Sequence, residues 1–371
     1  MGDELEFNPY YGVFPYHDFV KEEGIPVHEA YAVDCHTLAV EPWERLGGLG
    51  AYIHLVGRSD YLSAYVVEIP PGGQLNVEQH MHDELMHVIS GRGATVIEEP
   101  NGKKHSFEWG PNSIFGIPLN AKHQLFNGSG TEPARLAAVT DLPIIFNIFH
   151  RKEFIFDNPF VDTGELYGDE EGFYAHEAHA IQRENGRTEW YGNFFPDLTI
   201  WDNLTEYGGP GRLALSGGIT FPQSAHRPGL MVLPSRRYRA AHRHGPGVTI
   251  IGIQEARGFV VMWPPGGGPD DYILTPWQEG SVFVPPNMWY HQHINSGPLE
   301  NRQLRLFPPR PIMNYSFVDP KQWIPFTEED PWIRQKFEED LANQNLTSLM
   351  PEEAYVNPDF EWPEDFLKDK D

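Results

Sequence analysis

The sequence predicts an all-β protein made of two antiparallel β-barrel domains in one chain, followed by a short C-terminal helix. Three observations lead to this prediction. The 371 residues include 36 glycines and 34 prolines. Together they form a larger share of the chain than the ~12 % that these two residues usually contribute. Hydrophobic residues still make up 40 % of the chain, which is enough for large buried cores. Short runs of β-branched and aromatic residues alternate with the glycines and prolines, and the pattern occurs twice.

The repeat emerges when the chain is compared with itself. At an offset of 168 residues, seven positions between Trp109 and Asn127 are identical to positions between Trp277 and Asn295. Upstream, His80-Met81-His82 and His242-Arg243-His244 are similar at an offset of 162. Similar segments at a near-constant offset indicate duplicated structural units, with chance similarity between turn-rich strands as the alternative.

The repeat also sets the expected domain boundaries. We predict an N-terminal arm (1–50), a first barrel (51–150), a structured linker (151–210), a second barrel (211–318) and an acidic tail (319–371). The first barrel begins with strand-like runs at 51–57, 61–73 and 93–99. The tail contains the one clear helical pattern, in which Asp330 can cap, Pro331 suits the first turn, and Ile333, Phe337 and Leu341 recur four residues apart.

Charge and composition narrow the classes of partner. The formal net charge is -26, and a field of this sign repels nucleic acid and anionic lipid, so we expect a small-molecule ligand instead. No stretch approaches the roughly 18 apolar residues that a membrane span needs. The single cysteine, Cys35, cannot form a disulfide within the chain, and the first residues do not resemble a signal peptide. We therefore expect a cytoplasmic protein.

The first repeat carries a candidate metal site. His80 and His82 lie two residues apart, so on a strand their side chains share one face. His123 follows in the second shared motif, and three imidazoles from two strands can converge inside a barrel. Glu84 could add a carboxylate to give a mixed nitrogen and oxygen set that suits Fe(II) or Mn(II).

The second repeat offers His242, His244 and His291 as the equivalent neutral set. A carboxylate is missing there, since Thr249 occupies the place we align with Glu84. For both sets of histidines the alternative is a hydrogen-bonded cluster in a core that holds no metal.

With these motifs the sequence resembles the cupin superfamily, in its two-domain, bicupin form. The resemblance rests on the HxH pairs, on Glu84 seven residues before Gly91, and on Pro118, His123 and Asn127 with their counterparts in the second half. It implies two small antiparallel barrels, each able to hold a metal ion. It also implies that the family's ligand positions fall on His80, His82, Glu84, His123, His242, His244 and His291.

The sequence departs from the family pattern at Glu84, because only Asp83 separates it from His82. On a regular strand His80 and Glu84 would stand about 13 Å apart, too far to share an ion. A bulge could bring Glu84 into the site as a ligand. Otherwise its carboxylate would accept a hydrogen bond from an imidazole and fix its tautomer.

Two further residues are candidates for catalytic roles beside Glu84. His293 has the same strand parity as His291 and could donate a hydrogen bond to bound substrate or oxygen. Arg239 lies in an arginine-rich segment and could bind a substrate carboxylate with two hydrogen bonds, the alternative being an exposed side chain on an acidic surface.

Such sites predict a metal-dependent enzyme. The first hypothesis is an Fe(II) dioxygenase that binds O2 beside a small aromatic or enolisable substrate. The second is a non-oxidative Mn, Ni or Zn enzyme, such as a decarboxylase, isomerase or lyase, and copper is a further possible metal. The third is a metal-free bicupin that binds a small molecule or serves as a storage protein. Exposed sheet edges and the N-terminal arm lead us to expect a homodimer.

Overall fold

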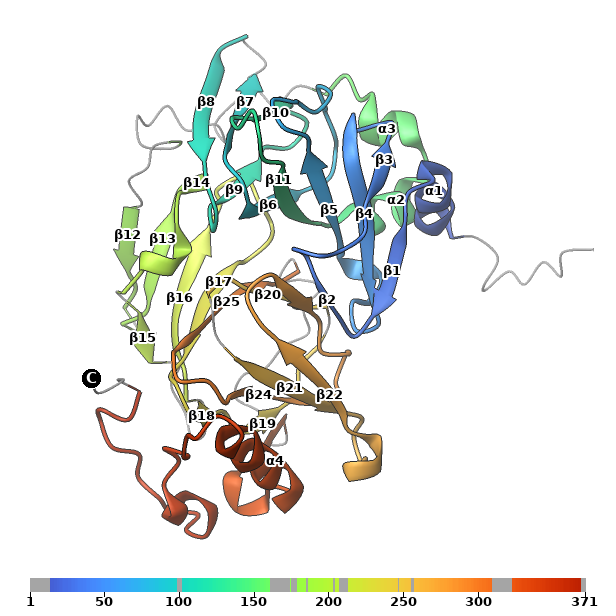
Figure 1. Cartoon of the computed structure of the whole chain (residues 1–371). Helices are drawn as coiled ribbons and strands as arrows, with labels where there is room; N and C mark the ends of the chain where they lie inside the picture. Colours follow the sequence, from blue (N-terminus) through green and yellow to red (C-terminus); the bar gives the residue numbers. More distant parts are fainter. Residues whose placement is uncertain are drawn as a thin grey trace, which may run out of the picture.

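The computed structural model describes residues 14–98, 102–160, 174, 179–184, 186–202, 204–206, 213–245, 247–254, 257–308 and 322–367. Parts of the predicted arm, linker and tail therefore lie outside the described residues. The chain folds into two halves that consist mainly of β-sheet. Figure 1 shows the first half, coloured blue to green, above the second half, coloured yellow to orange.

The first half contains two sheets. In the part of the chain that the structure describes, the larger has eight strands, in the spatial order β1 (Val27–Ala30), β4 (Gly48–Leu55), β5 (Ser63–Ile69), β11 (Ala134–Thr140), β6 (Glu84–Ser90), β9 (Ile114–Ile117) and β14 (Phe194–Phe195), with β3 (Glu41–Trp43) beside β4. The smaller has the order β10 (Lys122–Asn127), β7 (Gly93–Glu98) and β8 (Lys104–Trp109). Both sheets contribute aliphatic and aromatic side chains to one core, among them Val88, Phe107 and Leu136.

The second half repeats this arrangement. Its larger sheet runs in the order β12 (His179–Gln182), β13 (Thr188–Tyr191), β16 (Leu215–Thr220), β17 (Gly229–Leu233), β25 (Asn301–Leu306), β20 (Thr249–Gly252), β23 (Ser281–Phe283) and β2 (Ala32–Asp34), with β15 (Thr205–Glu206) beside β16. Its smaller sheet runs in the order β22 (Ile273–Trp277), β21 (Gly258–Trp263), β24 (Tyr290–Asn295), β19 (Ala241–His242) and β26 (Trp323–Ile324), with β18 (Arg237–Tyr238) beside β24.

The two larger sheets pack against each other and join the halves. Ile53 and Val66 of the first half belong to the same buried cluster as Ile251 and Leu304 of the second. Two strands also cross between halves: β2, from the arm, pairs with β23, and β14, from the predicted linker, pairs with β9. The halves therefore share one buried hydrophobic cluster where they meet.

Helices lie at the periphery. The predicted tail helix is confirmed as α4 (Pro331–Ala342): the Asp330 side chain accepts a hydrogen bond from the backbone of Trp332, and Ile333, Phe337 and Leu341 are buried. The structure also contains α1 (Pro15–Glu23), α2 (Leu142–Phe149) and α3 (Lys152–Phe156), which the sequence pattern did not indicate. Short 3-10 turns occur at Ser59–Tyr61, Leu198–Ile200, Pro269–Asp271, Phe326–Glu328 and Glu352–Tyr355. Among the described helices, none has the length and apolar character required to cross a bilayer.

The predicted fold class is confirmed: the protein is all-β, with two similar β-sheet units and a short C-terminal helix. Strand pairing within the described residues closes neither unit into a ring, so each is a two-sheet sandwich rather than a complete barrel. The duplication extends to single residues. A side-chain carbon on Gly93 or Gly258 would lie within 2.5 Å of a tryptophan ring, Trp109 in one half and Trp277 in the other.

The register corrects our alignment of the histidine pairs. Glu78 pairs with His123 in the first half, and His242 pairs with His291 in the second. The backbone carbonyls of His80 and His244 accept hydrogen bonds from Asn120 and Met288, which are themselves 168 residues apart. The offset upstream is therefore 164, not 162. The correct counterparts are Glu78 with His242 and His80 with His244.

Candidate metal centres

The first half gathers His80, Glu84 and His123, all buried, with one potential ligand atom of each within 4.8 Å of the others. His123 comes from β10, and Glu84 is the first residue of β6. The chain bends at Met81 and His82, so His80 is not on the same regular strand as Glu84. This bend brings the Nε2 atom of His80 to 3.7 Å from the Oε1 atom of Glu84, the close approach that a regular strand would prevent.

Hydrogen bonds fix these side chains and leave their inner atoms unpaired. Tyr65 donates its hydroxyl to the Oε2 atom of Glu84 at 2.6 Å. The Nδ1 atoms of His80 and His123 lie 2.9 and 3.1 Å from backbone carbonyls. The buried Nε2 of His80 and Oε1 of Glu84 have no hydrogen-bond partner among the described residues. Unpaired buried lone pairs that converge on one point fit a divalent metal.

Protonation in this centre suits a metal at His123 and Glu84 but not at His80. Burial alone would lower the pKa of His80, yet the Glu84 and Glu78 carboxylates raise it, so a metal would displace a proton from this imidazole. Burial lowers the pKa of His123 to about 4, assisted by the nearby charge of His80. Burial alone would raise the pKa of Glu84, but the close approach and charge of His80, with contributions from His82 and Tyr65, bring it to about 2. A neutral imidazole and an ionised carboxylate are the forms that bind metal.

His82, also predicted as a ligand, lies beside this group rather than within it. Its ring stacks on His80 with centroids 3.7 Å apart, and its Nδ1 lies 2.8 Å from the hydroxyl of Thr140. The structure therefore brings together three of the four side chains predicted for the first half.

Our sequence reasoning missed Glu78. It occupies the backbone position of His242, and its carboxylate accepts a hydrogen bond from Arg45 at 2.6 Å. Glu78 stands two residues before His80, the same spacing as His80 to His82, so the signal was present in the sequence. The more conspicuous histidine pair displaced it.

The second half gathers His242, His291 and His293, whose ligand atoms also lie within 4.8 Å of one another. His291 and His293 point to the same side of β24, as their parity predicted. The Nε2 of His291 and the Nδ1 of His293 are buried without a hydrogen-bond partner in the described structure. His244 packs against His291 with ring centroids 4.7 Å apart. Burial lowers the pKa of all four imidazoles, that of His244 to about 4.

A small cavity of about 20 Å³ adjoins these histidines. Its lining consists of Arg239, His242, His244, Val248, Ile250, His293, Arg305 and Phe307. Arg239 and Arg305 are 3 % and 6 % exposed, so Arg239 is not the exposed surface arginine considered as an alternative. A volume of this size holds about one water molecule.

Strand register explains why the second site is cationic. Val248 stands in the place of Glu84, because β20 and β6 correspond with the offset of 164. In the same register Gly229 corresponds to Tyr65. Arg305, which pairs with Gly229, therefore corresponds to Ala138, which pairs with Tyr65. The carboxylate and phenol of the first half are thus replaced by a guanidinium, and neither Val248 nor Thr249 restores the missing acid.

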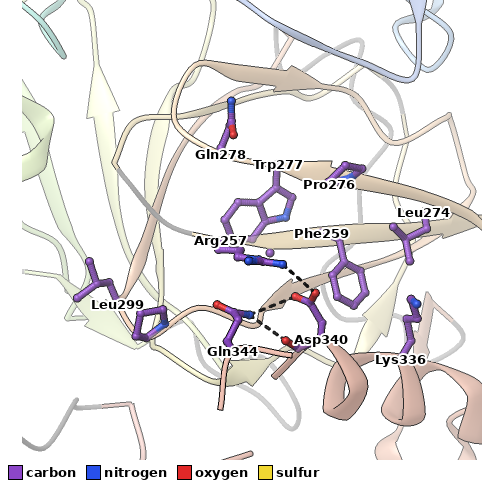
Figure 2. A pocket seen from close by; sticks show the side chains of 12 residues that line it. Arg257, Phe259, Leu274, Pro276, Trp277, Gln278, Leu299, Lys336, Asp340 and Gln344 are labelled. Atoms are coloured by element: carbon purple, nitrogen blue, oxygen red, sulfur yellow. Dashed lines mark hydrogen bonds and ion pairs between the residues drawn. The ribbon is translucent and has the colours of Figure 1, made fainter. Parts of the chain in front are cut away.

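A larger pocket of about 560 Å³ lies outside the sandwich, between α4 and strands β21 and β22 (Figure 2). Asp340, the one carboxylate among the described residues that line it, already has three partners: Arg257 at 3.4 Å, the amide of Gln344 and the hydroxyl of Ser296 at 2.5 Å. These contacts attach the helix to the sheet, and the pocket has no catalytic grouping comparable to the two histidine clusters.

Comparison with known proteins gives a distant likeness. No family model matches the chain, and no curated protein matches it. Among solved structures, oxalate decarboxylase of Bacillus subtilis, in a study of its substrate binding mode, is 15 % identical over 86 % of this chain and 87 % of that one, with a TM-score of 0.47. Another structure of that enzyme, described with Mn(II) centres, is 15 % identical over 83 % of this chain and 84 % of that one, with a TM-score of 0.47. A formate complex of the oxalate decarboxylase of Lactobacillus farciminis is 14 % identical over 75 % of this chain and 86 % of that one, with a TM-score of 0.46.

Proposed function

We propose that this protein is a metal-dependent enzyme that converts a small organic carboxylate without consuming oxygen, as a decarboxylase, lyase or isomerase does. The cavity of the second half carries this proposal, because it combines neutral imidazoles with the guanidinium groups of Arg239 and Arg305. Imidazoles can hold a divalent ion, and guanidinium groups recognise carboxylates through paired, charge-assisted hydrogen bonds.

Each side chain has a role in this proposal. Arg239 and Arg305 would bind and orient the substrate carboxylate. The Nη1 of Arg239 lies 3.1 Å from the sulfur of Met231, a weak acceptor that a carboxylate can replace. His293, whose Nδ1 has no partner among the described atoms, is placed to hold or transfer a proton. A divalent metal held by His242 and His291 would supply Lewis-acid stabilisation of negative charge.

The size of the cavity favours the non-oxidative chemistry. About 20 Å³ is far below the roughly 150 Å³ of a cavity that holds an aromatic ring, so a small substrate group is favoured over an aromatic one. It also leaves little room for O2 beside a bound substrate. An oxygen-consuming reaction would require both reactants at the metal together.

A second candidate is the Fe(II) dioxygenase. The grouping of His80, His123 and Glu84 supports it, since two histidines and one carboxylate with open coordination positions are typical of non-haem Fe(II) oxygenases. In that case turnover would take place in the first half, and it would consume O2.

Turnover of a panel of small mono- and dicarboxylates, followed by NMR with and without air, tests the proposal. We expect turnover without oxygen and a fall in kcat/KM of about 100-fold or more in Arg239→Met, because a buried charged hydrogen bond to the substrate is lost. Arg243→Met is the matched control, since Arg243 packs on the ring of Tyr290 instead.

Three results would contradict the proposal. Stoichiometric oxygen uptake during turnover would favour the dioxygenase. Full activity in Arg239→Met would remove the role of the second-half cavity. Protein that binds no metal after dialysis against divalent ions would instead be a metal-free binding protein.

A further inference from the structure

We propose that the two centres select different metals: the first an oxygen-preferring ion such as Mn(II), the second a nitrogen-preferring ion such as Zn(II). This inference rests on the proposed function only in treating both clusters as metal sites. It goes further because it assigns a distinct chemical preference to each half.

The difference follows from the corresponding positions. In the first half they hold two carboxylates and two imidazoles, namely Glu78, His80, Glu84 and His123. In the second half the same positions hold His242, His244, Val248 and His291. The second half adds His293, whose counterpart at the offset of 168 is the core residue Leu125. At these positions one centre thus has oxygen and nitrogen donors, and the described side chains of the other offer nitrogen donors only.

Donor chemistry converts this difference into selectivity. Carboxylate oxygens suit hard ions such as Mn(II), whereas imidazoles suit zinc, copper and nickel. Mn(II) stands lowest in the Irving–Williams order, so a site without a carboxylate holds it poorly. Zinc bonds strongly to neutral imidazole nitrogen and does not need the anionic ligand.

Local charge acts in the same direction. In the first centre Glu84 is a buried carboxylate that the Tyr65 hydroxyl contacts, and Glu78 is a second carboxylate, its side chain 12 % exposed, that Arg45 contacts. Among the described residues that line the cavity of the second centre there is no acid, whereas Arg239 and Arg305 are both present. Two nearby positive charges oppose binding of a dication, and the ions that form the strongest bonds to imidazole overcome this repulsion best.

Metal titration of the full-length protein tests the inference. After removal of metals with a chelator, Mn(II) is added and free Mn(II) is measured by electron paramagnetic resonance, and Zn(II) binding is measured by competition with a coloured chelator. We expect one Mn(II) per chain and a second, zinc-selective site. Glu84→Gln should weaken Mn(II) binding at least 10-fold and leave the zinc-selective site unchanged.

The reciprocal variant uses the register between the halves. Val248→Glu introduces a carboxylate at the place of Glu84 and should create a second Mn(II) site, whereas Val248→Gln, of similar size but neutral, should not. Should Val248→Glu fail to fold, the double variant Glu84→Gln, Glu78→Gln tests the inference instead. It should lose Mn(II) binding and keep the zinc-selective site.

Equal Mn(II) affinity at two sites in the unmodified protein would overturn the inference, and so would unchanged Mn(II) binding in Glu84→Gln. Both outcomes are independent of catalysis. Two unlike sites in an inactive protein would leave the selectivity standing and remove the proposed function. Two sites of equal Mn(II) affinity in an active enzyme would remove the selectivity and leave the proposed function standing.

Discussion

Glu78 and His242 occupy the same backbone position in the two halves: Glu78 pairs in antiparallel register with His123, and His242 pairs in the same way with His291. One side chain is a carboxylate and the other an imidazole. Because this exchange accompanies that of Glu84 for Val248, the two halves share a scaffold but differ in the charge that they present to a ligand.

Tyr65 is expected to tune the first centre. Tyr65→Phe removes the hydroxyl that donates to Glu84 at 2.6 Å, so the carboxylate loses its fixed orientation. We expect divalent metal affinity to fall about 10-fold, the lower end of the usual effect of such supporting hydrogen bonds. Equilibrium dialysis against a competing chelator measures the change. Tyr272→Phe, a tyrosine of the second half, should leave this affinity unaltered.

Gln303 is expected to reduce stability. It is 0 % exposed, and neither atom of its amide group has a hydrogen-bond partner among the described residues. Its counterpart by strand register is Leu136, a core residue of the first half. We expect Gln303→Leu to raise the free energy of unfolding by about 1–2 kcal/mol, since the desolvation penalty of the amide disappears. Urea denaturation measures it.

The reverse exchange in the first half is the control for Gln303. Leu136→Gln places an amide in an apolar core and should lower the free energy of unfolding by about 2 kcal/mol or more. A loss of stability in Gln303→Leu would contradict the prediction and indicate that the Gln303 amide binds a ligand or ordered water.

The fold could be predicted because its signals are local and repeated. Hydrophobic alternation, Gly/Pro turns and the conspicuous repeat from Trp109 to Asn127 are visible in the sequence. Helix α4 also carried a cap and a four-residue period. Helices α1 to α3 escaped prediction because they are short, and α2 (Leu142–Phe149) is almost wholly apolar, so it has no polar face to reveal its period.

The candidate site was predicted in part. Its residue types could be found from spacing, but its register could not, because a shift of two residues preserves strand parity and every HxH match. Only the backbone pairing shows that His80 corresponds to His244 and not to His242. Arg305 was missed because its place beside the histidines depends on a strand far along the chain.

Asp83 is expected to couple the first centre to the second half. It lies directly before Glu84, and its carboxylate accepts hydrogen bonds from the Ser224 hydroxyl at 2.8 Å and the Ala225 backbone at 2.7 Å. We expect Asp83→Ala to lower the free energy of unfolding by about 1–3 kcal/mol, because two hydrogen bonds to a carboxylate are lost. Urea denaturation at fixed pH gives the value.

A double-mutant cycle isolates this contact. Ser224→Ala should cost less alone, and the Asp83 and Ser224 substitutions should show a coupling energy of about 0.5–3 kcal/mol. Fully additive effects would mean that the hydroxyl contact contributes nothing and that Asp83 acts through the backbone of Ala225.

Glu329 is expected to make stability depend on pH. Burial raises its pKa to about 7, although Tyr238 and Gln292 donate hydrogen bonds to its carboxylate at 2.7 and 2.5 Å. A raised carboxyl pKa means that the folded state binds the proton more tightly than the unfolded state. The stabilisation is therefore complete below about pH 4.5, and it is lost as the pH rises through 7.

Glu329→Gln isolates this effect, because its amide stays neutral at every pH. Relative to this variant, the unmodified protein should lose on the order of 3 kcal/mol of unfolding free energy between pH 4.5 and 8. Urea titrations at several pH values measure the difference, with the exposed Glu328→Gln as control. Parallel pH profiles for the unmodified protein and Glu329→Gln would show that the carboxyl is ionised in the fold. The hydrogen bonds from Tyr238 and Gln292 would then outweigh its burial.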